Sequence, residues 1–503
     1  MSKDNREKEQ SAGLPLSIRL AQDIKGQVDT LLHGPFTEHA RLMERLRNLS
    51  DTYLYTEETE ALPPVIVRKS RSIGWEKLKG HSFAFVDGGL AVPDTLFGGP
   101  VLLQVGTYTV QPGERDLQKR EDFRMYPVLH RAFEGGDPHA EGFPSLIRMI
   151  AECLGGLSAL YRNEGLSGLF FHGPLVYPMA SFAGSSPFSE GDIDSFLQEG
   201  DFKDAEGRSL KERYLTHMDQ VCYPLMTEDS SSLVGHRVFE PVTWLAFLLN
   251  DFLRLAQRRG KSPLIAGAVE RVQTSLFVEK VVFPRLFRWC KQHDSGGSLN
   301  QFLGRTDLSD PKRSVERLGY NDAIFTAMLL QEGEYTEFWE LPYTEQFRPC
   351  DVQFPHLKHP VSLDFRVLAS NRVIVDGVRV GFPSVRGSYL QVSSEREPIR
   401  VEVFSELDLL SSGTHLQEAL ALAIMFSKLL PGYGFPVGLD IADKFAHIPK
   451  WMSGGYQKAL DLQMQLQEAG LSERTPVEQE RSRLISLARR LQKRAWHARP
   501  KSQ

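Results

Sequence analysis

The residues best suited to chemistry in this chain are polar side chains that follow short apolar segments. Asp87 follows the apolar run Phe83–Val86 and is itself followed by Gly88 and Gly89. An apolar run that ends in Asp-Gly is typical of a buried strand that brings a carboxylate to its C-terminal edge, where glycines turn the backbone. A carboxylate there can hold a divalent cation. The same dipeptide is also common in ordinary turns, so Asp87 alone leaves both interpretations open.

Two further polar residues have the spacing to join Asp87. Residues 145–161 carry apolar side chains at helical intervals, with Glu152 beside the apolar stripe. Residues 168–175 then repeat the pattern of a short apolar strand, a polar residue (His172) and a glycine turn. If the two strand ends meet, Asp87, Glu152 and His172 converge on one cation, as in the acidic cluster of a two-metal nuclease. The alternatives are a solvated helix glutamate and a hydrogen-bonded histidine at a strand end.

The elements that must position these residues belong to an α/β protein. Residues 16–49 predict one or two amphipathic helices broken near Gly34-Pro35, and their apolar stripe requires burial within the chain or against a partner. Strands are expected in 83–110, 361–392 and 399–404, and a helix in 238–257. We expect a helical arm at 1–60, a main domain at 61–455 with an insertion at about 180–235, and a helical tail at 456–503.

Composition excludes several classes of protein. The formal net charge of −5 provides no bulk attraction to nucleic acid, so contact with DNA requires a local basic patch or a partner. No apolar stretch approaches the ~20 residues of a membrane span, the N-terminus does not resemble a signal peptide, and the four scattered cysteines are typical of reduced thiols. A soluble, cytoplasmic protein is expected. No phosphate-binding loop of an ATPase occurs, so any motor must be another chain.

Between about residues 80 and 450, the order of these motifs resembles the NurA nuclease family. That family has a strand ending in Asp-Gly-Ser, a helix glutamate, and a second strand ending in Asp-Gly-x-Leu. The corresponding segments here are Val86–Gly89, Glu152, His172–Leu175, Ile265–Arg271, Asn321-Asp322 with Gly333-Glu334, Pro398–Glu402 and Gly432–Pro436.

The resemblance implies roles for further residues. Tyr433 and Asp443 would join Asp87 and Glu152 as catalytic residues, and Arg271 and Arg400 would contact DNA. The sequence also departs from the family pattern. His172 replaces a metal-binding aspartate, Asp443 stands nearest the place of a histidine, and Glu270 stands where a basic residue is expected. Imidazole accepts manganese more readily than magnesium, so Mn²⁺ is the expected cation, with Mg²⁺ as the alternative.

The resemblance further implies a fold and a function. We expect a ribonuclease H-like mixed sheet flanked by helices, and metal-dependent hydrolysis of DNA ends in repair or in defence against foreign DNA. The expected partner is a HerA-like hexameric ATPase, and the expected assembly is a homodimer. Two alternatives remain open. One is a catalytically weak adaptor that threads DNA for the motor, and the other is a nuclease that acts on RNA.

Overall fold

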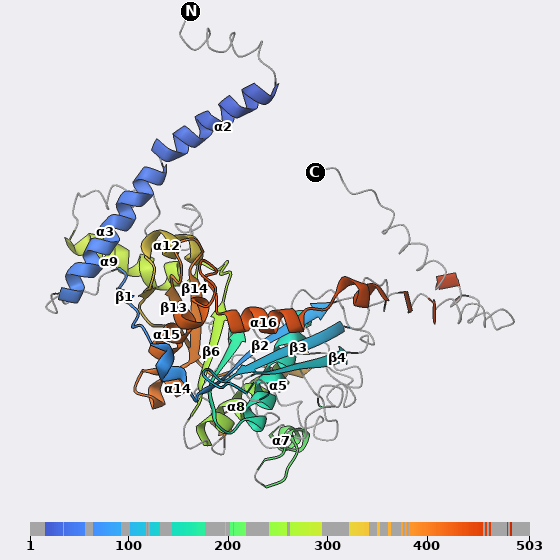
Figure 1. The fold of residues 1–503 in the computed structure, drawn as a ribbon. Coiled ribbons are helices and arrows are strands. Elements are labelled where there is room, and N and C mark those ends of the chain that lie inside the picture. The colour runs from blue at the N-terminus through green and yellow to red at the C-terminus, as the bar shows by residue number, and fades with distance from the viewer. Residues whose placement is uncertain are drawn as a thin grey trace, which may run out of the picture. The chain divides into compact units, whose positions relative to one another are not determined.

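A computed structural model defines the fold (Figure 1). It describes residues 16–33, 35–55, 64–91, 101–116, 121–130, 143–176, 202–204, 206–217, 241–258, 262–293, 321–341 and 382–455, short pieces between 350 and 379, and isolated positions at 118, 197 and 458–484. The chain divides into two compact units. One comprises residues 1–69 and 271–337, and the other residues 70–270 and 338–503.

The first unit is mainly helical. Its N-terminal helix α2 ends at His33 and α3 begins at Pro35, in agreement with the break that the sequence predicted near Gly34-Pro35, and the described strands β1 and β7 pair in an antiparallel manner. Arg47 of α3 forms an ion pair of 2.7 Å with Glu334. The buried Asp322 accepts the backbone N–H groups of Phe277 and Val278. The elements are α2 (Leu16–His33), α3 (Pro35–Tyr55), β1 (Val67–Lys69), the π-helix η6 (Val278–Val282), α9 (Phe283–His293), α12 (Asp322–Leu329) and β7 (Glu334–Thr336).

The apolar stripe of α2 is exposed in the described structure. Ile18, Ile24, Val28 and Leu32 are each between 45% and 53% exposed. The sequence required burial of this stripe, within the chain or against a partner, and the described part of the chain does not bury it. A partner for the stripe stays a prediction.

The second unit is built around a mixed, mostly antiparallel sheet, which confirms the α/β class. Its strands lie in the order β13-β14-β6-β5-β2-β3-β4, with β8 paired to β13. Among the strand pairs of the described residues in this unit, only β2–β5 and β5–β6 are parallel. The strands are β2 (Ser82–Ala91), β3 (Val101–Val110), β4 (Glu121–His130), β5 (Leu166–His172), β6 (Leu264–Val269), β8 (Trp339–Glu340), β13 (Val385–Leu390) and β14 (Ile399–Phe404).

Helices cover both faces of this sheet. Gly155 of α5 packs against Val86, whereas Gly438 of α16 packs against Phe85. Successive side chains of a strand point to opposite faces, so α5 and α16 lie on opposite sides of β2 (Figure 1). Phe426 of α15 contacts the ring of Phe85 and so shares the face of α16. The helical elements are η1 (Trp75–Leu78), α5 (Phe143–Arg162), α7 (Leu210–His217), α8 (Pro241–Arg258), α14 (Ser405–Leu410), α15 (His415–Ser427) and α16 (Val437–Ala446).

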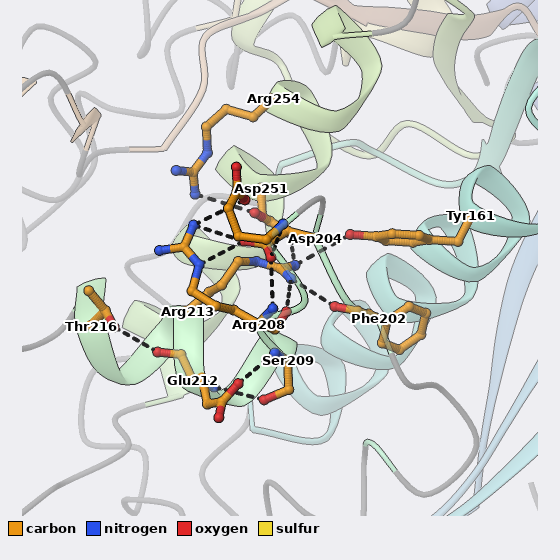
Figure 2. Close-up of polar contacts among 11 residues, drawn as sticks. Tyr161, Phe202, Asp204, Arg208, Ser209, Glu212, Arg213, Thr216, Asp251 and Arg254 are labelled. Carbon is orange, nitrogen blue, oxygen red and sulfur yellow. Dashed lines mark hydrogen bonds and ion pairs between the residues drawn. The ribbon is translucent and has the colours of Figure 1, made fainter.

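An arginine–aspartate network anchors the described part of the expected insertion (Figure 2). Arg213 of α7 forms an ion pair of 2.7 Å with Asp251 of α8, and both side chains are at least nine-tenths buried. Arg213 also donates to the carbonyl oxygen of Phe202, and Asp204 accepts hydrogen bonds from Arg208. These contacts tie the segment before α7 to α8.

The remaining described pieces are short. β9 (Cys350–Val352) pairs with β10 (Val361–Leu363), and β11 (Ile374–Val375) pairs with β12 (Val378–Arg379). Most of the expected C-terminal tail lies outside the described residues. Within the described part of the chain, no helix combines the length and apolar character needed to cross a membrane.

Candidate metal centre

Asp87 lies inside β2, so the expectation that the strand ends at this residue is wrong. β2 continues to Ala91 because β3 pairs with it from Phe83 onward over its whole remaining length. On the other side of β2, the pairing with β5 stops one residue before Asp87, and β5 ends at His172. The carboxylate of Asp87 therefore lies level with the end of β5, beside His172.

The two glycines after Asp87 allow close approach and do not turn the chain. Both lie within β2, and neither has a positive φ. A Cβ atom at Gly88 would lie 2.6 Å from Oε1 of Glu152, and a Cβ at Gly89 would collide with the carbonyl oxygen of Ala446 in α16. The Asp-Gly-Gly sequence is therefore a place where both α5 and α16 approach β2 closely.

Three candidate ligands converge on the α16 side of the sheet. Nδ1 of His172 lies 2.9 Å from Oδ2 of Asp87, and these two residues and Asp443 each offer a ligand atom within 4.8 Å of the others. Asp87 is buried, His172 is half-buried and Asp443 is exposed. The three ligand atoms thus lie close enough together to share one cation.

The electrostatics of the cluster favour positive charge. Burial opposes protonation of His172, but its hydrogen bond to Asp87 and the charges of Asp87, Glu152 and Asp443 together raise the pKa of the imidazole above its ordinary value. Burial and the adjacent Asp87 carboxylate raise the pKa of Asp443. A divalent cation would replace the imidazolium proton as the counter-charge of these acids.

Glu152 approaches from the opposite face. Its carboxylate lies against Gly88, whose Cβ position points away from the side occupied by Asp87. Among the described residues, none hydrogen-bonds to the buried Oε1 of Glu152, although Nε of Arg148 lies 3.5 Å away. Burial, opposed by Arg148 and assisted by Asp87, raises the pKa of Glu152 to about 7. The structure does not group Glu152 with the other three residues, and its role as a metal ligand stays a prediction.

Tyr433 adjoins this cluster through a residue that the sequence analysis did not assign. Its hydroxyl donates to Oδ1 of Asp440 at 2.7 Å, and Nζ of Lys444 donates to Oδ2 of the same carboxylate at 2.6 Å. Burial opposes ionisation of Asp440, but these hydrogen bonds outweigh it and lower the pKa. The signal for Asp440 was its place one helical turn before Asp443.

The two arginines expected to contact DNA have different surroundings. Arg271 is exposed, two residues beyond the end of β6. Arg400 is only 3% exposed, and its Nε donates to Oε1 of Glu402 at 2.7 Å. DNA contact by Arg271 stays a prediction. The guanidinium of Arg400 presents almost no surface to a ligand, because it lies against Glu402 and Tyr389, and DNA contact by Arg400 also stays a prediction.

The donor set fits a divalent cation. Carboxylate oxygens and one imidazole form a mixed hard and borderline set, which suits Mn²⁺ and also accepts Mg²⁺. The buried Oε1 of Glu152 is a further acceptor that lacks a hydrogen-bond donor among the described residues. A cation held by Asp87, His172 and Asp443 would supply Lewis-acid chemistry at the end of β5.

We expect Gly89→Ala to weaken Mn²⁺ binding about tenfold, the scale seen when the support of a metal ligand is disturbed. The added methyl group would force α16 away from β2 and draw Asp443 away from Asp87. Electron paramagnetic resonance of free Mn²⁺ measures the affinity. Gly74→Ala is the control, because Gly74 is exposed with φ −81° and no described heavy atom lies within 4 Å of its Cβ position. If Gly89→Ala binds Mn²⁺ as tightly as the wild type, the packing of α16 against β2 does not contribute to metal binding.

Without metal, we expect the protein to lose stability as pH rises from about 5 to 8. Glu152 has a folded-state pKa of about 7 against an ordinary value of 4.5, so between these values the folded chain holds a proton that the unfolded chain releases. At 1.36 kcal/mol per pH unit, the loss would be about 3 kcal/mol. Urea unfolding in chelator measures this loss, which should be smaller in Glu152→Gln and unchanged in the exposed Glu164→Gln. If the free energy of unfolding of Glu152→Gln falls with pH as steeply as that of the wild type, groups other than Glu152 cause the loss.

Comparisons with known proteins show a loose structural likeness. No family model and no curated protein sequence matches the chain. It is similar to the crystal structure of the NurA nuclease from Sulfolobus solfataricus, with 11% identity, a TM-score of 0.41, and coverage of 90% of this chain and 98% of the other. A NurA structure with manganese has 10% identity, a TM-score of 0.38 and coverage of 88% and 98%. A NurA structure bound to dAMP and manganese has 14% identity, a TM-score of 0.28 and coverage of 86% and 94%. All three TM-scores are below 0.5, so the likeness by itself establishes neither the fold nor the activity of this chain.

Proposed function

We propose that this chain is a metal-dependent deoxyribonuclease. The observation that carries the proposal is the convergence of Asp87, His172 and Asp443 beside the buried carboxylate of Glu152. Three elements distant in sequence, β2, β5 and α16, bring Asp87, His172 and Asp443 together, and α5 brings Glu152 to the other face of β2. A cation bound there would supply an activated water and charge stabilisation at a phosphodiester.

The side chains around the cation have separate tasks in this proposal. Asp87 and Asp443 hold it on the α16 side of the sheet, while His172, packed against the ring of Phe435, offers an imidazole nitrogen. Glu152 supplies negative charge from behind β2. Tyr433, kept in place by Asp440, is the group proposed to orient the scissile phosphate.

The choice of cation follows from His172. An imidazole in place of a third carboxylate leaves one negative charge fewer in the cluster and provides a borderline ligand. Mn²⁺ tolerates nitrogen ligands better than Mg²⁺, which demands oxygen ligands in near-ideal octahedral geometry. We therefore propose Mn²⁺ as the working cation and Mg²⁺ as a poorer substitute.

The finer parts of the proposal come from the sequence resemblance to the NurA family. They are a ribonuclease H-like arrangement of the second unit, action at DNA ends in repair or defence, a homodimer, and a HerA-like hexameric ATPase as partner. A net charge of −5 and the absence of an ATPase motif in the sequence support dependence on a partner. A hexameric motor would deliver DNA to the site at high effective concentration.

A cleavage assay tests the proposal. The full chain is incubated with Mn²⁺ and labelled linear DNA, single-stranded or duplex, alone and with a HerA-like ATPase and ATP, beside RNA of the same sequence. We expect weak cleavage of DNA alone and a strong increase with the motor. Stimulated ATP hydrolysis without cleavage would support the adaptor alternative and contradict the nuclease. Preferred cleavage of RNA would contradict the assignment to DNA.

A further inference from the structure

A buried ion pair lies two strands away from His172. Arg400 and Glu402 are on β14, with side chains 4% and 0% exposed, and Nε of Arg400 donates to Oε1 of Glu402 at 2.7 Å. One terminal nitrogen of Arg400 lies 3.4 Å from the hydroxyl of Tyr389 on β13. Removing two charges from water costs several kcal/mol per ion, and apolar replacements of such a pair are often as stable. Stability alone therefore does not account for this pair.

The second oxygen of Glu402 holds the turn that follows His172. Oε2 of Glu402 accepts the backbone N–H of Leu175 at 2.9 Å. The N–H of Gly173, whose φ is +122°, donates to the carbonyl oxygen of Ala268 in β6 at 2.8 Å. Two backbone donors within three residues after His172 are thus fixed, one by β6 and one by β14.

Gly267 makes this arrangement possible. It lies directly opposite Glu402 in the β6–β14 pair and opposite Phe171 in the β5–β6 pair. A Cβ atom at Gly267 would lie 2.6 Å from the carbonyl oxygen of Gly173 and 3.3 Å from the nitrogen of Leu175. The turn therefore lies over the one position of β6 that has no side chain, and the carboxylate of Glu402 meets it there.

We propose that Glu402, held by Arg400, is a positioning residue for the metal centre. By accepting the N–H of Leu175, Glu402 fixes the turn that ends β5 and thereby sets the place of His172 beside Asp87. Neither Arg400 nor Glu402 belongs to the group of candidate ligands Asp87, His172 and Asp443. A carboxylate forms a shorter and stronger hydrogen bond to a backbone N–H than a neutral acceptor, and the contact with Arg400 fixes the direction of that carboxylate. This inference rests on the proposed metal-dependent function.

Two double variants separate positioning from packing. Glu402→Gln/Arg400→Met removes both charges but leaves an oxygen that can accept the N–H of Leu175. Glu402→Met/Arg400→Met has nearly the same volume and no acceptor. Both avoid an unpaired buried charge, and both remove the contact of Arg400 with Tyr389, so they differ only in the acceptor. Glu402→Asp is a third variant. It keeps the charge that Arg400 requires, and its acceptor is one methylene group farther from Leu175.

The measurements are Mn²⁺ affinity by electron paramagnetic resonance, hydrogen exchange of the Leu175 amide in chelator, and thermal unfolding. We expect the Gln/Met variant to bind Mn²⁺ within about threefold of the wild type. The Met/Met and Glu402→Asp variants should bind about tenfold more weakly, the scale for loss of a group that orients a ligand. The Leu175 amide should exchange faster in the same two variants.

The outcomes distinguish this inference from the proposed function. Equal Mn²⁺ affinities in the Gln/Met and Met/Met variants would overturn the positioning role, whether both equal the wild type or both fall. If the Met/Met variant does not fold, wild-type affinity in Glu402→Asp together with faster Leu175 exchange would overturn it equally. If the wild type binds no Mn²⁺ through Asp87, the proposed function fails and this inference fails with it. The Mn²⁺ affinities of the wild type and of Asp87→Asn are sufficient to test the proposed function, independently of the Arg400 and Glu402 variants.

Discussion

Replacing Asp87 with asparagine is expected to lower Mn²⁺-dependent DNA cleavage at least about 100-fold, the scale at which loss of a metal-site group acts. Asp87 is 4% exposed and is central to the cluster, since its two oxygens face His172 and the N–H of Gly88. Asparagine keeps the shape and an acceptor for the Gly88 N–H, but it removes the charge that attracts the cation. The rate of cleavage of labelled linear DNA with the motor present measures the effect.

The control for this variant is Glu418→Gln, which removes one negative charge from an exposed position of α15. It should cleave at the wild-type rate, because a distant surface charge is screened by salt. Circular dichroism and thermal unfolding of Asp87→Asn should show an intact fold. Cleavage by folded Asp87→Asn at close to the wild-type rate would exclude Asp87 from the chemistry and remove the basis of the proposed metal centre.

The second large effect concerns the choice of metal at His172. His172→Asp is expected to raise Mg²⁺-dependent cleavage by tenfold or more, because a third carboxylate supplies the hard oxygen ligand that Mg²⁺ prefers. The same variant loses the imidazolium that offsets Asp87 and Asp443, so the cluster should depend more strongly on bound metal. Cleavage rates in matched concentrations of Mg²⁺ and Mn²⁺ give the ratio.

His172→Ala is the matched variant for this comparison. It removes the imidazole and adds no ligand, so cleavage should fall with both metals. If His172→Asp and His172→Ala behave alike in both metals, His172 is not a ligand, and its hydrogen bond to Asp87 serves only to orient that carboxylate.

Local sequence patterns were sufficient to predict several helices and strands of the fold. The helical spacing of residues 145–161 is confirmed by α5, and the break near Gly34 is confirmed between α2 and α3. The helix expected at 238–257 corresponds to α8, and the strand expected at 399–404 is β14. These features depend on side-chain periodicity and on glycine or proline at single positions, which neighbouring residues largely determine.

The meaning of the Asp-Gly-Gly sequence was decided by the tertiary structure. From the sequence, the glycines indicated a turn, because glycine after aspartate is most often found there. In the structure they lie within a strand, and their missing side chains admit Glu152 on one face and α16 on the other. No local pattern distinguishes a glycine that is needed for a turn from a glycine that lets another element pack against the backbone. The second requirement depends on elements up to several hundred residues away in the chain.

The sequence by itself determined an α/β chain, acids and a histidine that follow apolar segments, and a net charge of −5 that provides no bulk attraction to nucleic acid. The tertiary structure alone decided which of them meet. It placed Asp443 with Asp87 and His172, put Glu152 behind β2, and buried Arg400 against Glu402. The physical reason is that strand alternation and helix periodicity fix the direction of a side chain only relative to its own element. Convergence on one site depends instead on the pairing of strands and on close packing over glycines, which bring together residues far apart in the chain.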